Sequence, residues 1–135
     1  MDFLIDTSVW SRDSQPIVYS RLRILNEFDQ IWTCRAVDLE MTYNARSRDV
    51  ARDTARRRHL RVAPIDEIVM DRSVDMAVAM AEAGFHRHAK PIDLVIAASA
   101  EAAGLTVLHY DKDFDHIASV TGQPTEWVSP RGSLD

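Results

Sequence analysis

Short apolar runs alternate along this chain with longer segments whose apolar residues recur three or four positions apart. The apolar runs are typical of buried strands and cover residues 2–6, 31–34, 61–65, 105–110 and 125–128. The intervening segments predict helices over residues 16–28, 36–45, 47–59, 66–84, 94–103 and 113–120. Strands that alternate with helices form a parallel sheet covered on both faces. The pattern therefore predicts an α/β fold, a three-layer α/β/α sandwich with a central parallel sheet.

Length and composition indicate one globular unit. The chain has 135 residues, 46% of them hydrophobic, and a domain of this size buries roughly two-thirds of its unfolded surface. We predict a single domain over residues 1–135, with residues 129–135 as a frayed tail. No run of about 18 apolar residues predicts a membrane span. The start of the chain does not resemble a secretory signal, and the single Cys34 fits a reducing cytoplasm.

The charge distribution limits the ways in which the protein could bind nucleic acid. A net charge of −5 disfavours binding through a basic surface alone, but it is compatible with an enzyme that reaches phosphate through a bound cation. Arginines are concentrated between residues 46 and 61. They form either a solvated helix with ion pairs to Asp49 and Asp53 or a basic surface that binds an RNA backbone.

Acidic residues are expected to meet at the edge of the sheet where the strands end. Asp6 follows the first strand and Asp111 follows the strand at residues 105–110, so both lie where parallel sheets bind ligands. Glu40 and Asp93 lie near the starts of helices that can face the same crevice, and Asp113 is two residues beyond Asp111. Acids this close repel each other unless a cation neutralises them, and oxygen ligands favour Mg²⁺ or Mn²⁺.

These acids are also compatible with roles that involve no metal. Each acid alone is consistent with a helix cap or a turn residue. Asp111 followed by Asp113 also suggests a phosphotransferase nucleophile, but too few residues follow Asp111 to supply the rest of such a site, and none is a lysine except Lys112 beside it. A catalytically silent interaction module is a further alternative. Such a module is expected to have lost one or more of the acids, and here all are present.

Four segments resemble, in order, the acidic motifs of PIN-domain proteins. They are residues 4–10, 38–43, 92–98 and 106–114. The resemblance runs through nearly the whole chain, and a stand-alone domain of this length is most similar to the VapC toxins of bacterial VapBC toxin–antitoxin pairs. The resemblance implies a cytoplasmic, homodimeric endoribonuclease that depends on Mg²⁺ or Mn²⁺ and is held inactive by a VapB-type antitoxin.

The resemblance also implies roles for particular residues. Catalytic and metal-binding roles fall on Asp6, Glu40, Asp93 and Asp111, with Asp113 as a fifth metal ligand. Contact with the RNA substrate is expected from Thr7, Ser8, Arg87, His88 and Lys90, and the two hydroxyl groups could also orient Asp6. PIN-domain proteins usually have a Thr-Arg pair before the last acidic motif, whereas this chain has His109-Tyr110. The resemblance therefore does not tell which residue contacts the substrate at that position.

Overall fold

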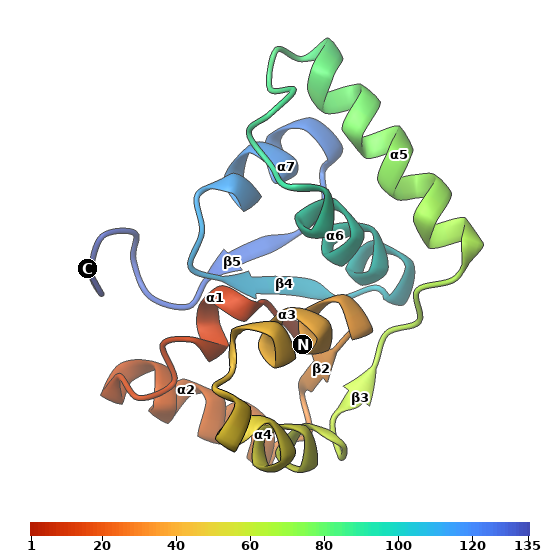
Figure 1. Cartoon of the computed structure of the whole chain (residues 1–135). Coiled ribbons are helices and arrows are strands. Elements are labelled where there is room, and N and C mark those ends of the chain that lie inside the picture. The colour runs from red at the N-terminus through yellow and green to blue at the C-terminus, as the bar shows by residue number, and fades with distance from the viewer.

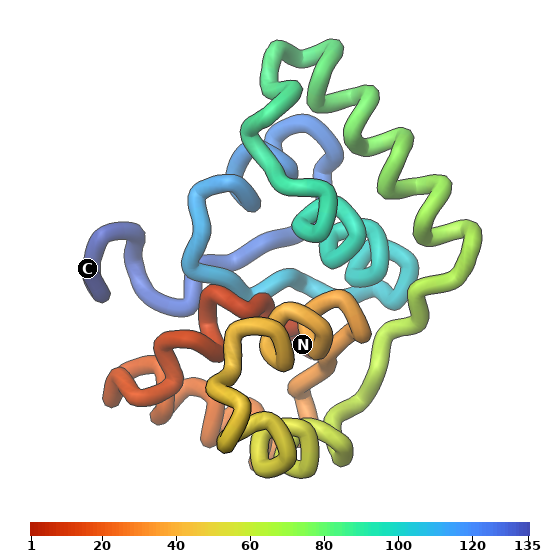
Figure 2. Tube along the Cα trace, in the orientation of Figure 1, coloured from red at the N-terminus to blue at the C-terminus, as the bar shows by residue number.

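The computed structural model describes all 135 residues and confirms the α/β/α sandwich with a parallel sheet (Figures 1 and 2). Five parallel strands are arranged in the order β3-β2-β1-β4-β5. Their bounds are β1 Phe3–Ile5, β2 Ile31–Thr33, β3 Arg61–Val62, β4 Thr106–His109 and β5 Thr125–Trp127. This order places β1 directly beside β4, with Phe3 opposite Thr106 and Ile5 opposite Leu108. The residues that follow these two strands are therefore neighbours.

Helices cover both faces of the sheet. They are α1 Thr7–Trp10, α2 Pro16–Glu27, α3 Arg35–Asn44, α4 Val50–Arg57, α5 Glu67–Glu82, α6 Pro91–Ala103 and α7 Asp113–Thr121, with a 3₁₀ turn, η1, at Ser47–Asp49. In Figure 1, α5, α6 and α7 lie on one side of the sheet and α2 lies on the other. None of these helices is both long and apolar enough to cross a membrane.

The core is divided by the sheet into two apolar clusters. Successive side chains of a strand point to opposite faces. Leu4 and Val107 accordingly belong to the larger cluster, which packs against α3, α5, α6 and α7, whereas Ile5 and Leu108 belong to the smaller cluster with α1 and α2. Burial on both faces explains why these short strands are almost continuously apolar.

The structure differs from the sequence-based prediction in two segments. The helix predicted from residue 94 begins at Pro91, since proline suits the first turn of a helix. The helix predicted over residues 47–59 is split into η1 and α4. The frayed tail over residues 129–135 stays a prediction; in the structure the Leu134 N–H donates to the Tyr110 hydroxyl at 2.9 Å and Ser129 is buried.

Candidate active site

Asp6 ends β1 and caps α1. Its Oδ2 accepts hydrogen bonds from the Ser8 backbone N–H at 3.0 Å and from the Ser8 hydroxyl at 2.6 Å. Its Oδ1 is buried and has no hydrogen-bond partner. Buried carboxylate oxygens normally have a partner, so this unpaired oxygen is available to bind a cation.

The hydroxyl groups of Thr7 and Ser8 hold the acids in place. The Ser8 hydroxyl, which donates to Asp6, also accepts from the Tyr110 backbone N–H at 2.8 Å and so connects the ends of β1 and β4. The Thr7 hydroxyl donates to Oε1 of Glu40 at 2.8 Å, which fixes α3 against α1. Ser8 thus orients Asp6 as expected, whereas Thr7 orients Glu40 instead; direct contact of either hydroxyl with RNA stays a prediction.

Three further carboxylates form a compact cluster. Asp93, Asp111 and Asp113 each offer one oxygen, and these oxygens all lie within 4.8 Å of one another. Asp93, in the first turn of α6, is only 5% exposed and accepts from the Lys90 backbone N–H at 3.2 Å. Asp111 accepts from the Asp113 backbone N–H at 2.9 Å, which turns the chain so that both acids face the cluster.

Burial and the charges of neighbouring acids make Asp6, Asp93 and Asp113 hard to ionise. Burial raises the pKa of Asp6 to about 6, and the charges of Glu40 and Asp111 contribute, whereas the Ser8 hydrogen bonds oppose the shift. Burial likewise raises the pKa of Asp93 to about 7, with contributions from Asp6 and Asp111. The pKa of Asp113 is also raised, by burial and by Asp111. The five acids therefore form one electrostatic unit, which a cation would stabilise.

His109 supports the loop that carries the last acids. Its ring lies between Phe114 and Trp127, with centroids 5.1 and 4.9 Å away. Burial lowers the pKa of His109 to about 4, so its ring is neutral at physiological pH and Nδ1 can accept from the Asp111 backbone N–H at 3.1 Å. The sequence did not indicate this role, because it depends on which side of the loop the ring occupies.

The basic residues of the loop before α6 differ in their relation to the acidic cluster. The positive charge of Lys90 opposes the raised pKa of both Asp93 and Asp113, so Lys90 acts directly on the acidic cluster. His88 instead packs against Phe85 and His116, with ring centroids 5.2 and 4.9 Å away. His88 and Arg87 are exposed. Lys90 is exposed as well, but it is the one of the three whose charge acts on the acids.

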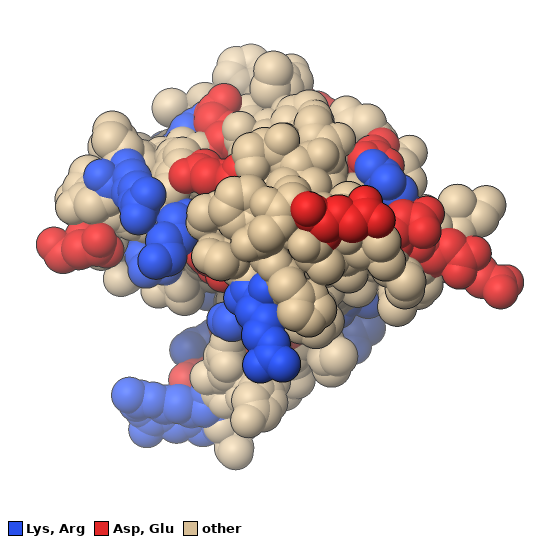
Figure 3. Space-filling model, turned by 90° about the horizontal axis from the view of Figure 1, so that it is seen from above, with Lys and Arg blue, Asp and Glu red and all other residues tan.

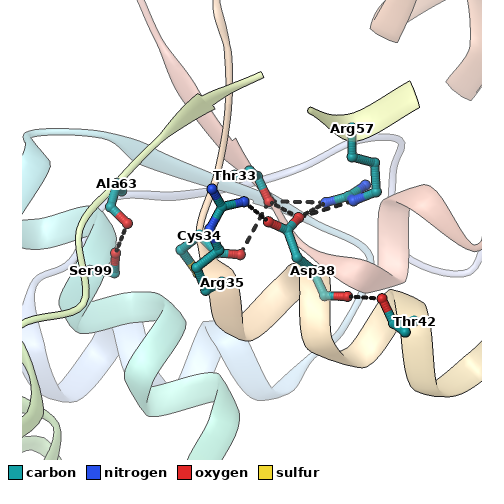
Figure 4. A network of polar contacts seen from close by, with 8 residues as sticks. All are labelled: Thr33, Cys34, Arg35, Asp38, Thr42, Arg57, Ala63 and Ser99. Carbon is teal, nitrogen blue, oxygen red and sulfur yellow. Dashed lines mark hydrogen bonds and ion pairs between the residues drawn. The ribbon is translucent and has the colours of Figure 1, made fainter. Parts of the chain in front are cut away.

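Asp38 and Glu40, the two acids of the motif at residues 38–43, have different surroundings. Asp38 does not join Glu40 near Thr7: its Oδ1 accepts from Arg57 at 2.7 and 3.0 Å and from the Thr33 hydroxyl at 2.8 Å (Figure 4). Burial raises the pKa of Asp38, but the hydrogen bonds outweigh burial and bring the pKa below its usual value. The Arg57 guanidinium also lies 4.8 Å from the centre of the Trp10 ring. Arg57 thus connects α4 to the elements that carry the site.

Replacing Arg57 by glutamine will lower the free energy of unfolding by about 2–4 kcal/mol, because Asp38 then loses its buried cationic partner. The Arg57 and Asp38 side chains are only 11% and 19% exposed. Urea denaturation measures the effect. The matched control is Arg52→Gln on the same helix, whose ion pair with Asp49 is exposed and contributes less than about 0.5 kcal/mol. Equal effects of the two substitutions would contradict a buried anchoring role for Arg57.

Most of the arginine-rich stretch is engaged in ion pairs. The pairs are Arg52 with Asp49, Arg56 with Asp13, Arg57 with Asp38, and Arg61 with Asp29 and Asp2. These pairs favour the solvated, ion-paired helix over an RNA-binding surface for these four residues. Asp53, however, does not form the ion pair that was predicted for it. Arg46, Arg48 and Arg58 are exposed and make no ion pair.

Known proteins match this chain in both sequence and fold. The sequence profile of the PIN domain matches residues 3–120. Ribonuclease VapC18 of Mycobacterium tuberculosis strain H37Rv is 40% identical over 139 residues, covering 99% of this chain and 100% of that relative. Ribonuclease VapC21 of the same species is 41% identical over 133 residues, covering 97% and 96%. The crystal structure of DNA-bound VapBC from Salmonella typhimurium has a TM-score of 0.78 at 19% identity, covering 96% of this chain and 99% of that chain, and shares the fold.

Proposed function

The chain belongs to the PIN domain family, among the VapC ribonucleases, and we propose that it is a metal-dependent endoribonuclease that acts as the toxin of a toxin–antitoxin pair. One observation carries the proposal: the unpaired Asp6 oxygen belongs to the same electrostatic unit as Asp93, Asp111 and Asp113, whose oxygens lie within 4.8 Å of one another. All the acids are present, so no observation favours a catalytically silent module.

The residues at the site fit a divalent cation. We assign Asp6, Glu40, Asp93 and Asp111 as catalytic metal ligands and Asp113 as a further ligand, because this oxygen-only set suits Mg²⁺ or Mn²⁺. When bound, such an ion lowers the pKa of a coordinated water and neutralises charge on the phosphodiester.

The remaining residues of the site prepare it for substrate. Ser8 orients Asp6, Thr7 orients Glu40, and His109 holds the backbone of Asp111. We propose that Lys90, with Arg87 and His88 on the same loop, contacts the RNA backbone. An RNA strand then meets carboxylates that are already in position.

We also propose a VapB-type antitoxin, a homodimer and a cytoplasmic location. The VapBC assembly from Salmonella typhimurium supports the first. A stripe of exposed apolar side chains on α5, at Met70, Val74 and Val78, supports the second, because contiguous apolar surface commonly marks a protein interface. The single free thiol of Cys34 fits a reducing compartment.

A circular single-stranded RNA tests the activity, because only an endonuclease can open a molecule that has no ends. We expect the wild type to linearise the circle in Mn²⁺ and to leave a DNA circle of the same sequence closed. Asp6→Asn is expected to leave both closed. An RNA circle that resists the wild type in both Mg²⁺ and Mn²⁺ would overturn the ribonuclease proposal.

An inhibitory partner is expected to place an arginine among Asp6, Glu40, Asp93 and Asp111. A forked guanidinium matches paired carboxylates and replaces the positive charge that the site needs. Changing that arginine of the partner to glutamine will restore RNA cleavage while the complex stays assembled. Cleavage assays and size-exclusion chromatography of the same sample measure both effects. A complex that inhibits while the acids still bind Mn²⁺ would contradict this prediction.

A further inference from the structure

A cavity of about 400 Å³ lies beside the acidic cluster. Asp111 of the cluster lines it, as does Ser8, which holds Asp6, so the cavity and the candidate active site share a wall. Three cationic side chains, Arg12, Lys112 and Arg131, also line it, together with the acidic Asp135. Its volume falls in the range of roughly 300–1,000 Å³ that is usual for ligand sites.

Arg12 is held in place without an acidic partner. Its Nη1 donates to the Ser8 carbonyl at 2.8 Å, and its guanidinium lies 4.6 Å from the centre of the Tyr110 ring. Several arginines of this chain pair with carboxylates, as Arg21 does with Glu126, whereas Arg12 pairs with none. Its positive charge and remaining N–H donors are therefore free to bind an anion in the cavity.

The C-terminal segment forms another part of the cavity wall. The Leu134 N–H donates to the Tyr110 hydroxyl at 2.9 Å, and the Leu134 carbonyl accepts from the Gln15 side chain at 3.3 Å. These bonds hold Arg131 and Gly132 at the cavity. Figure 1 shows the segment beside α1 and the end of β4, and the same side of the molecule in Figure 3 carries both basic and acidic side chains.

We propose that this cavity binds the RNA nucleotide next to the scissile phosphate and that Arg12 binds the neighbouring backbone phosphate. The inference rests on the proposed ribonuclease function. An RNA strand that presents one phosphate to the carboxylates carries its next phosphate one nucleotide away, and the adjoining cavity offers Arg12, a cation without an acidic partner. A guanidinium recognises phosphate through two parallel hydrogen bonds, and Lys112 and Arg131 add positive charge. Arg12 is thus a substrate-binding residue of this subsite.

Binding of a fluorescent single-stranded RNA dodecamer to the full chain, measured by anisotropy in EDTA, tests the subsite without cleavage. Arg12→Gln is expected to weaken binding about tenfold, since a hydrogen bond to a charged group contributes about that much. The slope of log affinity against log salt should fall by about 0.7, the value for one phosphate contact on a single strand. The control Arg23→Gln removes the same charge from α2 outside the cavity and should change neither quantity.

Neutral methylphosphonates, placed at one phosphate of the dodecamer at a time, then locate the contact. One position is expected to weaken wild-type binding about tenfold and to leave binding by Arg12→Gln unchanged, because the two changes remove the same interaction. Arg12→Lys, which keeps the charge, should retain part of the affinity. Thermal melting of each variant verifies its fold.

The outcomes separate this inference from the proposed function. Two results would overturn the subsite even if the protein cleaves RNA. One is that Arg12→Gln binds RNA as tightly as the wild type does. The other is that each methylphosphonate weakens binding equally in the wild type and in Arg12→Gln. Equal competition by an acidic peptide of matched charge would also overturn it, because the cavity would then be a general anion surface. A wild type that binds RNA through Arg12 but cuts no RNA would overturn the ribonuclease proposal, and Arg12 would then be an RNA contact with no scissile phosphate beside it.

Discussion

Asp93→Asn will reduce metal-dependent RNA cleavage more than about a hundredfold, since even residues that only orient a metal ligand typically contribute 10–100-fold. Asp93 lies in the first turn of α6, is buried, and shares a cluster with Asp111 and Asp113. Asparagine keeps the shape of the side chain but removes the charge through which we propose that Asp93 binds the cation. Cleavage assays in Mn²⁺ measure the loss, with the exposed Asp71→Asn on α5 as the matched control.

The same substitution will stabilise the metal-free protein at neutral pH. Because burial raises the pKa of Asp93 from 3.8 to about 7, the folded chain keeps a proton that the unfolded chain has released. The free energy of unfolding of the wild type therefore falls as pH rises between about 4 and 7. Asparagine does not titrate, so the variant should exceed the wild type by up to about 4 kcal/mol above pH 7 and match it near pH 4.

Thermal melts from pH 4 to 8, in EDTA and in millimolar Mn²⁺, check both effects on stability. The wild type should gain stability with Mn²⁺, because the ion binds the folded site, and Asp93→Asn should gain much less. If Asp93 were only a helix cap, asparagine would cap nearly as well and the response to metal would be unchanged. That result would remove Asp93 from the site.

EDTA will abolish RNA cleavage, and Mg²⁺ or Mn²⁺ will restore it. The affinity for the ion will also depend on pH, because Asp6 and Asp93, with pKa values of about 6 and 7, must lose their protons before they bind metal. Between pH 7 and pH 5 the apparent dissociation constant for Mn²⁺ should rise at least about a hundredfold.

Isothermal titration with Mn²⁺ at several pH values measures this dependence. Asp6→Asn removes one of the two titrating ligands and should leave a weaker affinity that changes less with pH. Asp71→Asn, at the exposed surface of α5, should behave as the wild type. Cleavage that continues in excess EDTA would contradict the metal mechanism, and an affinity independent of pH would contradict the raised pKa values.

The motif at residues 38–43 contains two acids with different roles, and the contacts that assign these roles are not specified by the local sequence. Asp38 and Glu40 are two positions apart on α3, and nothing in their spacing tells which one meets the other acids. The structure decides it through Arg57 on α4, which takes Asp38 into an ion pair, and through Thr7, which donates to Glu40. Both contacts join residues far apart in the chain.

Asp113 illustrates the same limit. It follows Asp111 by two residues, and that spacing leaves the direction of its side chain open. The hydrogen bond from its own N–H to Asp111 turns the chain and brings its carboxylate into the cluster. Such a turn depends on local backbone geometry, which the identities of two acids do not specify.

The layers and the edge of the sheet that carries the acids follow from the amino-acid sequence alone. Continuous apolar runs require burial on both faces, and parallel strands end at a common edge, so Asp6 and Asp111 had to lie along that edge. How the acids are brought together depends on the strand order, which sets β1 beside β4, and on contacts between distant residues. Ser8 bonds to Tyr110 across 102 residues, and Arg131 and Gly132 of the C-terminal segment line the same cavity as Arg12. Side-chain direction and long-range packing set these contacts, and neither is encoded in local periodicity.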